Sequence, residues 1–150
     1  MASNFKLQPV PLRDERSLFT LVENRSVYSM DTCELNVFET HQQANNVNLK
    51  FDDWVLTSML RGKKVMHLAD KPAFDYLPGE SVIVPPSELM KIDFPEADKE
   101  TPTQCLALAI SAEQISSTIQ LLNERHAKAE TGEEWRISEE HLHLANNLEL

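Results

Sequence analysis

The segment from Leu60 to Ala97 constrains the fold most, because it alternates short apolar runs with turn-forming residues. Turn chemistry occurs at Gly62, at Asp70-Lys71-Pro72, at Pro78-Gly79 and at Pro85-Pro86. Glycine and proline at this spacing end strands and favour tight turns. Short strands separated in this way are typical of an antiparallel barrel or sandwich. The sequence therefore predicts a mainly β domain.

The apolar runs predict six strands in and around this segment: Trp54–Leu60, Lys64–Leu68, Phe74–Tyr76, Glu80–Val84, Met90–Phe94 and Gln104–Ile110. Strand-like pieces precede them at Val27–Met30 and Leu35–Phe38. The polar segment His41–Asn48 is predicted to be a loop. Alternation along the second of the six strands places Val65 and His67 on one face.

After Ile110 the apolar period changes from that of a strand to that of a helix. Ser111 and Gln114 form a capping box, and Ile115, Ile119 and Leu122 follow on one helical face. A second helix is predicted from Ser138, with a stripe formed by Leu142, Ala145 and Leu148. Near the other end, Pro9 and Pro11 favour a loose arm, and Asp14 can cap a short helix.

Charge and composition exclude several functions. The 150 residues include 14 Lys and Arg against 24 Asp and Glu, a formal charge of −10, which repels phosphate backbones. Three isolated glycines cannot build a phosphate-binding loop. No export signal or membrane-length apolar run is found, so a cytoplasmic domain without membrane contact is expected. Cys33 and Cys105 are accordingly predicted to be reduced.

Four segments resemble the N-terminal effector domain of AraC-type transcriptional regulators: Leu35–His41, Met59–Val65, Phe74–Ser81 and Pro102–Leu108. The resemblance extends over residues 35–124. It implies a cupin-like antiparallel β-barrel that binds a small-molecule effector, followed by C-terminal helices used in dimerisation. In the family, two helix-turn-helix units then bind DNA, and the sequence contains no counterpart of them.

The resemblance and the residue patterns together predict three regions. Residues 1–11 form a flexible arm, residues 12–110 a cupin-like barrel with a short N-terminal helix, and residues 111–150 a helical dimerisation and linker region. The last helix reaches Leu150 without a cap, so the chain is expected to be a fragment. Contact with DNA is then expected through a missing C-terminal part, not through this fragment.

No metal, other cofactor or catalytic residue is predicted. Metal-dependent cupins place paired histidines before the turn that matches Gly62, and a further histidine after the proline-rich turn that follows Gly79. This chain has no histidine in the first place and Met90 in the second. A thioether alone is a poor ligand for the hard or borderline metals of such barrels. A bound metal would instead favour a small free-standing cupin enzyme acting on a sugar-like metabolite.

Four residues are predicted to bind the effector. Trp54, Phe74 and Tyr76 can provide aromatic walls, and His67 can donate or accept a hydrogen bond. The alternative is that these four residues have structural roles only, and it is the more common case. Aromatic side chains in strands mostly belong to the core, and a strand histidine is commonly half-exposed.

Three leucines are predicted at a subunit interface. Leu121 lies off the apolar stripe of its helix, and Leu142 and Leu148 belong to the stripe of the next helix. Packing of both helices on their own barrel explains the stripes equally well. His141 and His143 point to different faces of the predicted helix and cannot share a metal ion. Glu139 and His143 could do so geometrically, but a solvated pair on an exposed face is expected instead.

Three hypotheses follow from these patterns. The first is a metal-free sensor that binds an effector in its barrel and passes the change to its helices. The second is the cupin enzyme described above, and the third is a purely structural dimerisation module. They rank in this order.

Overall fold

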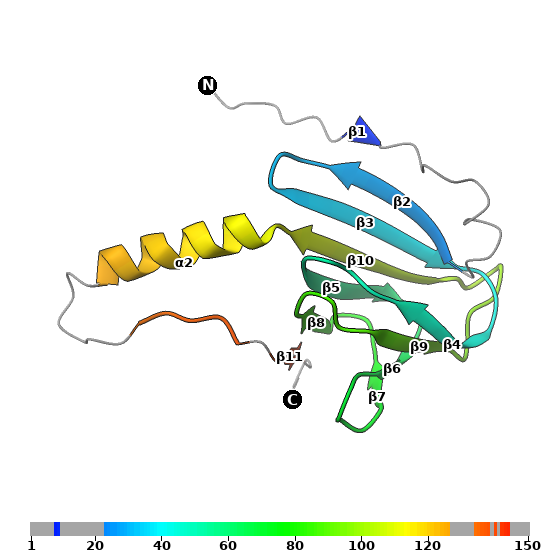
Figure 1. Ribbon diagram of the computed structural model, residues 1–150. Helices are drawn as coiled ribbons and strands as arrows, with labels where there is room; N and C mark the ends of the chain where they lie inside the picture. Colours follow the sequence, from blue (N-terminus) through cyan, green and yellow to red (C-terminus); the bar gives the residue numbers. More distant parts are fainter. Residues whose placement is uncertain (1–7, 10–22, 127–133, 139, 141, 145–150) are drawn as a thin grey trace, which may run out of the picture.

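The computed structural model describes residues 8–9, 23–126, 134–138, 140 and 142–144 of the chain. In this part, two antiparallel sheets enclose a single core, and one helix projects away from them (Figure 1). The prediction of a mainly β, antiparallel domain is confirmed.

Seven strands form the larger sheet. In spatial order they are β1 (Gln8–Pro9), β2 (Glu23–Ser29), β3 (Cys33–Thr40), β10 (Thr103–Ile110), β5 (Trp54–Arg61), β8 (Ser81–Val84) and β11 (Leu142–Leu144). Strand β10 lies in the middle and pairs with both β3 and β5. The smaller sheet contains β4 (Ala44–Leu49), β9 (Met90–Phe94), β6 (Lys64–His67) and β7 (Phe74–Tyr76).

The core forms between the two sheets because every second residue of most strands points inward. In β10 the inward residues include Ala107 and Ala109, whose small side chains leave room for larger ones from the other strands. The largest side chains with less than 2% exposure are Tyr76, Phe94, Met59, Met66, Met90, Ile92, Val55, Val82 and Val84. Burial of each such side chain stabilises the fold by about 1.5–3 kcal/mol.

The turn after β5 requires glycine. Gly62 has a φ of +80°, in the region that other residues rarely adopt. A Cβ atom at this position would lie 2.7 Å from the Thr103 Oγ1 atom and 3.1 Å from the Thr103 Cα atom. The backbone therefore approaches β10 more closely than a side chain would allow, and the turn between β5 and β6 is as predicted.

The six predicted strands from Trp54 to Ile110 are all present, but the predicted loop 41–48 is wrong over most of its length. Strand β4 occupies Ala44–Leu49 and pairs with β9. Ala44, Val47 and Leu49 pack against the core, and asparagines occupy the exposed positions. A bulge shifts the register between Ala44 and Val47, which hides the alternation from a reading of the sequence.

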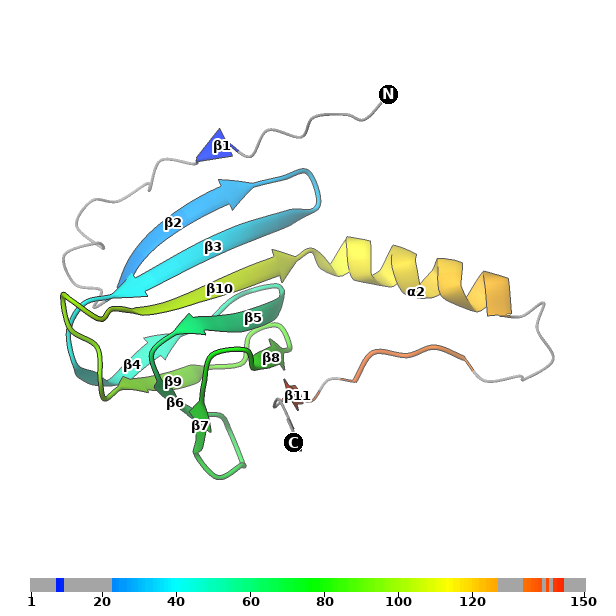
Figure 2. The same ribbon diagram turned by 180° about the vertical axis from the view of Figure 1, so that it is seen from behind.

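Helix α2 (Ala112–His126) begins as predicted, since the Gln114 N–H donates to the Ser111 Oγ atom at 3.2 Å. None of its residues is buried. Both views show it extending away from the sheets, with residues 134–138 returning beside it toward β11 (Figure 2). Among the described residues, the helix therefore buries no side chain against the sheets.

The predicted second helix is wrong at Leu142. Residues Leu142–Leu144 form strand β11, which pairs with β8 in the register Leu142–Ile83, His143–Val82 and Leu144–Ser81. The alternation of Leu142, His143 and Leu144 fits an edge strand, and a neighbouring sheet edge outweighs a weak helical pattern. Ala145 and Leu148 lie outside the described residues.

Two further predictions stay open. The short N-terminal helix and most of the arm fall outside the described residues, although Gln8 and Pro9 pair with β2. The two sheets are separate hydrogen-bonded ladders in the described part of the chain, so a closed barrel is not confirmed. No helix in the described part is long and apolar enough to cross a membrane.

Candidate functional site

Two of the four predicted binding residues meet at one edge of the molecule, where β7, β8 and β11 come together. The rings of Phe74 and His143 are stacked, with centroids 4.2 Å apart and planes inclined by 22°. The Tyr76 ring meets His143 edge to face at 6.3 Å. The His143 Nε2 atom lies 3.1 Å from a carboxylate oxygen of Glu80. These four residues are called the edge site below.

Tyr76 forms the floor of the edge site and is only 1% exposed. Its hydroxyl lies 2.7 Å from the Thr57 Oγ1 atom, which also lies 3.3 Å from the Val82 carbonyl oxygen. Burial raises the pKa of the Tyr76 phenol well above its ordinary value, and the hydrogen bond with Thr57 opposes this only in part. Tyr76 is therefore a neutral, fixed aromatic wall.

Glu80 owes its position to the predicted turn at Pro78-Gly79. Gly79 has a φ of +84°, and its N–H donates to the Met59 carbonyl oxygen at 3.1 Å. The Met59 N–H donates in turn to the Glu80 carbonyl oxygen at 3.1 Å. The Glu80 carboxylate accepts the Leu77 N–H at 3.0 Å, and its side chain is 13% exposed. A carboxylate is thus held beside an aromatic wall.

Trp54 and His67 do not belong to the edge site. Trp54 is buried at the start of β5 opposite Ile110, on the other face of the strand from Thr57. His67 lies 2.7 Å from a carboxylate oxygen of Asp93, and its side chain is 39% exposed. The Asn46 N–H and then His67 hold the pKa of Asp93 below its usual range. The predicted faces of β6 are correct, but they direct His67 away from the core.

A second polar group lies inside the core. Lys64 is 2% exposed, and its ammonium lies 3.2 Å from the Cys105 Sγ atom and 5.0 Å from the centre of the Phe94 ring. The Thr103 Oγ1 atom is buried and has no hydrogen-bond partner among the described residues. No disulfide joins Cys33, which is half-buried, to Cys105, which is buried.

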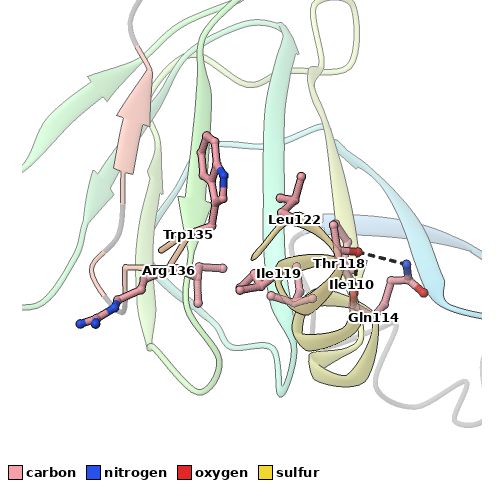
Figure 3. A pocket seen from close by; sticks show the side chains of 9 residues that line it. Ile110, Gln114, Thr118, Ile119, Leu122, Trp135 and Arg136 are labelled. Carbon is pink, nitrogen blue, oxygen red and sulfur yellow. Dashed lines mark hydrogen bonds between the residues drawn. The ribbon is translucent and has the colours of Figure 1, made fainter. Parts of the chain in front are cut away.

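A groove of about 410 Å³ separates α2 from the segment that returns beside it (Figure 3). Its walls are mostly apolar, with polar groups from Gln114, Thr118 and Arg136, and the apolar lining residues are Ile110, Ile115, Ile119, Leu122, Trp135 and Ile137. Asn123 joins the two sides, since its amide donates to the Trp135 carbonyl oxygen at 3.1 Å and accepts the Trp135 N–H at 2.6 Å. The side chain of Arg136 extends away from the helix.

The predicted interface leucines fall in different places. Leu121 is 47% exposed on α2 but does not line the groove. Leu142 is 50% exposed on β11, and Leu148 lies outside the described residues. Leu121 and Leu142 thus lie on different elements, and the predicted interface stays a prediction.

The family model described as "AraC-type transcriptional regulator N-terminus" matches residues 32–147, which is most of the chain. The chain belongs to this family. The resemblance noted from the four sequence segments is thereby confirmed. No curated protein matches the sequence as a relative.

Several solved structures, among them a cupin, are similar to this AraC-type domain in fold. A protein of the RmlC-like cupin family with a double-stranded β-helix fold from Methanocaldococcus jannaschii has a TM-score of 0.54 and 13% identity, covering 75% of this chain and 97% of that one. The DMSP lyase DddQ from Ruegeria pomeroyi also scores 0.54, with 14% identity over 71% of this chain and 57% of that one.

AerE from Microcystis aeruginosa has a TM-score of 0.53 and 10% identity, covering 69% of this chain. The AraC-type domain spans only 45% of the length of AerE. Identities this low establish a shared cupin fold and nothing about shared chemistry.

The sequence predicts no metal site in this AraC-type domain, and its described residues offer few groups of possible ligands. They contain no group of three or more His, Cys, Asp or Glu side chains arranged to hold a metal ion. Met90, at the late ligand position of metal cupins, is 1% exposed within the core.

Glu80 and His143, which the sequence analysis did not place in a binding site, form the polar part of the edge site. The alternation of Leu142, His143 and Leu144 was the signal for His143.

Proposed function

We propose that the chain is the sensing and dimerisation domain of an AraC-type regulator and binds a small-molecule effector without a metal. Phe74, Tyr76 and Glu80 of the edge site would contact the effector, which combines aromatic walls with one fixed polar group. The observation that carries the proposal is that this site touches β11, the strand that returns from α2. Occupancy of the site can therefore bias the arrangement of the helix.

The same proposal assigns no DNA contact to this domain. The net charge of −10 repels the phosphate backbone. In regulators of this family a helix-turn-helix part would bind DNA, and the effector would act by changing how two such parts are presented.

A second copy of the chain is proposed to pack on α2. The apolar stripe of the helix lines one wall of the groove, and residues 134–138 cover it only in part, so that no residue of α2 is buried. Ile119→Asp is expected to shift the dimer to a monomer in sedimentation equilibrium, because it puts a carboxylate into the groove. Leu121→Asp, beside the groove, should weaken the dimer less. Gln120→Asp, at an exposed position outside the groove, is the matched control.

A thermal-shift screen against a metabolite panel tests the sensor. An effector at a hundred times its dissociation constant should stabilise the domain by about 2.7 kcal/mol. The shift should be unaffected by a chelator and should be lost in Phe74→Ala. A melting temperature that falls when chelator is added would instead favour a free-standing cupin enzyme acting on a sugar-like metabolite.

A further inference from the structure

One of the four residues of the edge site, His143, is surrounded by the other three. We propose that His143 is a built-in ligand of Phe74, Tyr76 and Glu80, and that the effector is a planar nitrogen heterocycle with a ring N–H, of the imidazole type, which displaces it. This inference rests on the sensing function proposed above and names the chemical class of the effector.

The contacts of His143 define what the site selects. Phe74 stacks on one face of the imidazole at 4.2 Å, and Tyr76 presents its edge at a right angle. Glu80 places a carboxylate oxygen 3.1 Å from the Nε2 atom, where it can accept a ring N–H. A flat aromatic ring fills the first two contacts, and a ring N–H donor satisfies the third. A carboxylate ligand would instead be repelled by Glu80.

In the described part of the chain, two sets of contacts hold strand β11, the ladder with β8 and the side-chain contacts of His143. The strand lies at the edge of the larger sheet, and among the described residues it pairs with β8 alone, over three residues. Leu142 and Leu144, on either side of His143, are 50% and 46% exposed, whereas the His143 side chain is 26% exposed. A ligand that takes the place of the imidazole therefore leaves β11 attached by its three-residue ladder alone, which lowers the cost of local opening.

Release of β11 would reach the helix. Residues 134–138 lie between α2 and β11 in the chain, and Asn123 joins Trp135 to α2. With β11 undocked, this segment is held at the helix but no longer at the sheet. Binding at the edge site would thereby release α2 and residues 134–138 from the sheet, and these two elements line the proposed dimer groove.

The test removes the His143 side chain and then offers the site a free imidazole ring. The probe is 4-methylimidazole, the side-chain analogue of histidine, titrated into the full chain and followed by ligand-observed NMR. His143→Ala is expected to bind the probe about tenfold more tightly than the native chain, as follows if β11 occupies the site about nine-tenths of the time. His41→Ala, which removes a histidine paired with Glu39 elsewhere, is the matched control and should bind like the native chain.

Two more variants complete the design. His143→Ala combined with Glu80→Gln should lose the gain, because the acceptor charge is gone. His143→Ser replaces alanine as the opening variant if alanine lowers the melting temperature relative to His41→Ala. Equal binding of the probe by the opened variant and the native chain would overturn the inference.

The outcomes separate this inference from the sensor itself. A carboxylate or uncharged sugar found in the metabolite screen would leave the sensing function standing and overturn the imidazole class. A screen without any stabilising metabolite would count against the sensor, whereas probe binding by His143→Ala would still support His143 as the occupant of the edge site.

Discussion

The core between the sheets differs in burial from the part of the chain that comprises α2, residues 134–138 and β11. This second part is called the arm from here on and is distinct from the N-terminal residues 1–11. Phe94, Val82 and their neighbours in the core are completely buried, whereas no residue of α2 is. The arm is instead held by a few specific contacts, chiefly those of Asn123 and His143. Stability thus resides in the sheets, and the arm belongs to the part of a protein that opens locally at low cost.

Phe94→Ala should have the largest effect, because it opens a cavity in the centre of the core. A loss of about 3–5 kcal/mol in the free energy of unfolding is expected. Urea denaturation followed by circular dichroism measures it. Leu121→Ala on the arm serves as the control and should change the free energy by less than about 0.5 kcal/mol. Similar losses of unfolding free energy in the two variants would contradict the claim that stability resides in the sheets.

Gly62→Ala should be the next most damaging, at roughly 1–3 kcal/mol. The new Cβ atom meets Thr103, and φ stays positive. A double-mutant cycle with Thr103→Ala separates the two causes, since removal of Oγ1 relieves the clash but not the backbone strain. The added cost of Gly62→Ala should shrink in that background without reaching zero. An unchanged cost would assign the whole effect to the backbone.

The core should also respond to alkaline pH through Tyr76. Its pKa is raised in the folded state, so the folded chain keeps the phenol proton after the unfolded chain has lost it. The contribution is fully present below pH 10.0, the ordinary value, and declines as the pH rises above it. Urea midpoints between pH 8 and 11 should fall less steeply in Tyr76→Phe than in the native chain. Parallel curves would contradict the burial effect.

Asn123→Ala should change global stability least, within roughly 0.5 kcal/mol, because it acts only on the arm. Its local effect should be clear, since Trp135 loses both hydrogen bonds to α2. Faster hydrogen exchange of the Trp135 amide is expected, with exchange in β10 unchanged. Gln120→Ala, which removes a contact to Glu124 within the helix, is the control. Faster exchange in β10 as well would show that arm and core are one cooperative unit.

The sequence predicted the sheets well because turn chemistry is local. Gly62 and Pro78-Gly79 mark their turns by their own conformational preferences. Strands β4 and β11 were missed because each depends on a partner strand far away in the chain. Asparagines fill the exposed positions of β4, and β11 forms only where the edge of β8 is available.

The edge site was half predicted for the same reason. Phe74 and Tyr76 lie on one short strand, so alternation alone groups them. Glu80 joins them through a turn bonded to β5, and His143 through pairing with β8. Trp54 was misplaced because its face of β5 is opposite to that of Thr57. Neither the pairing nor the face can be derived from residue types alone.

Because β11 is covalently linked to the rest of the domain, a free ligand must exceed a threshold concentration before it can displace His143. A group tethered in the same chain meets its site at an effective concentration in the millimolar range. A free ligand that competes with His143 for Phe74 and Glu80 must overcome that concentration before the strand leaves. Changes in the length of chain between α2 and β11 would therefore tune the sensitivity of the domain without altering any residue that touches the ligand.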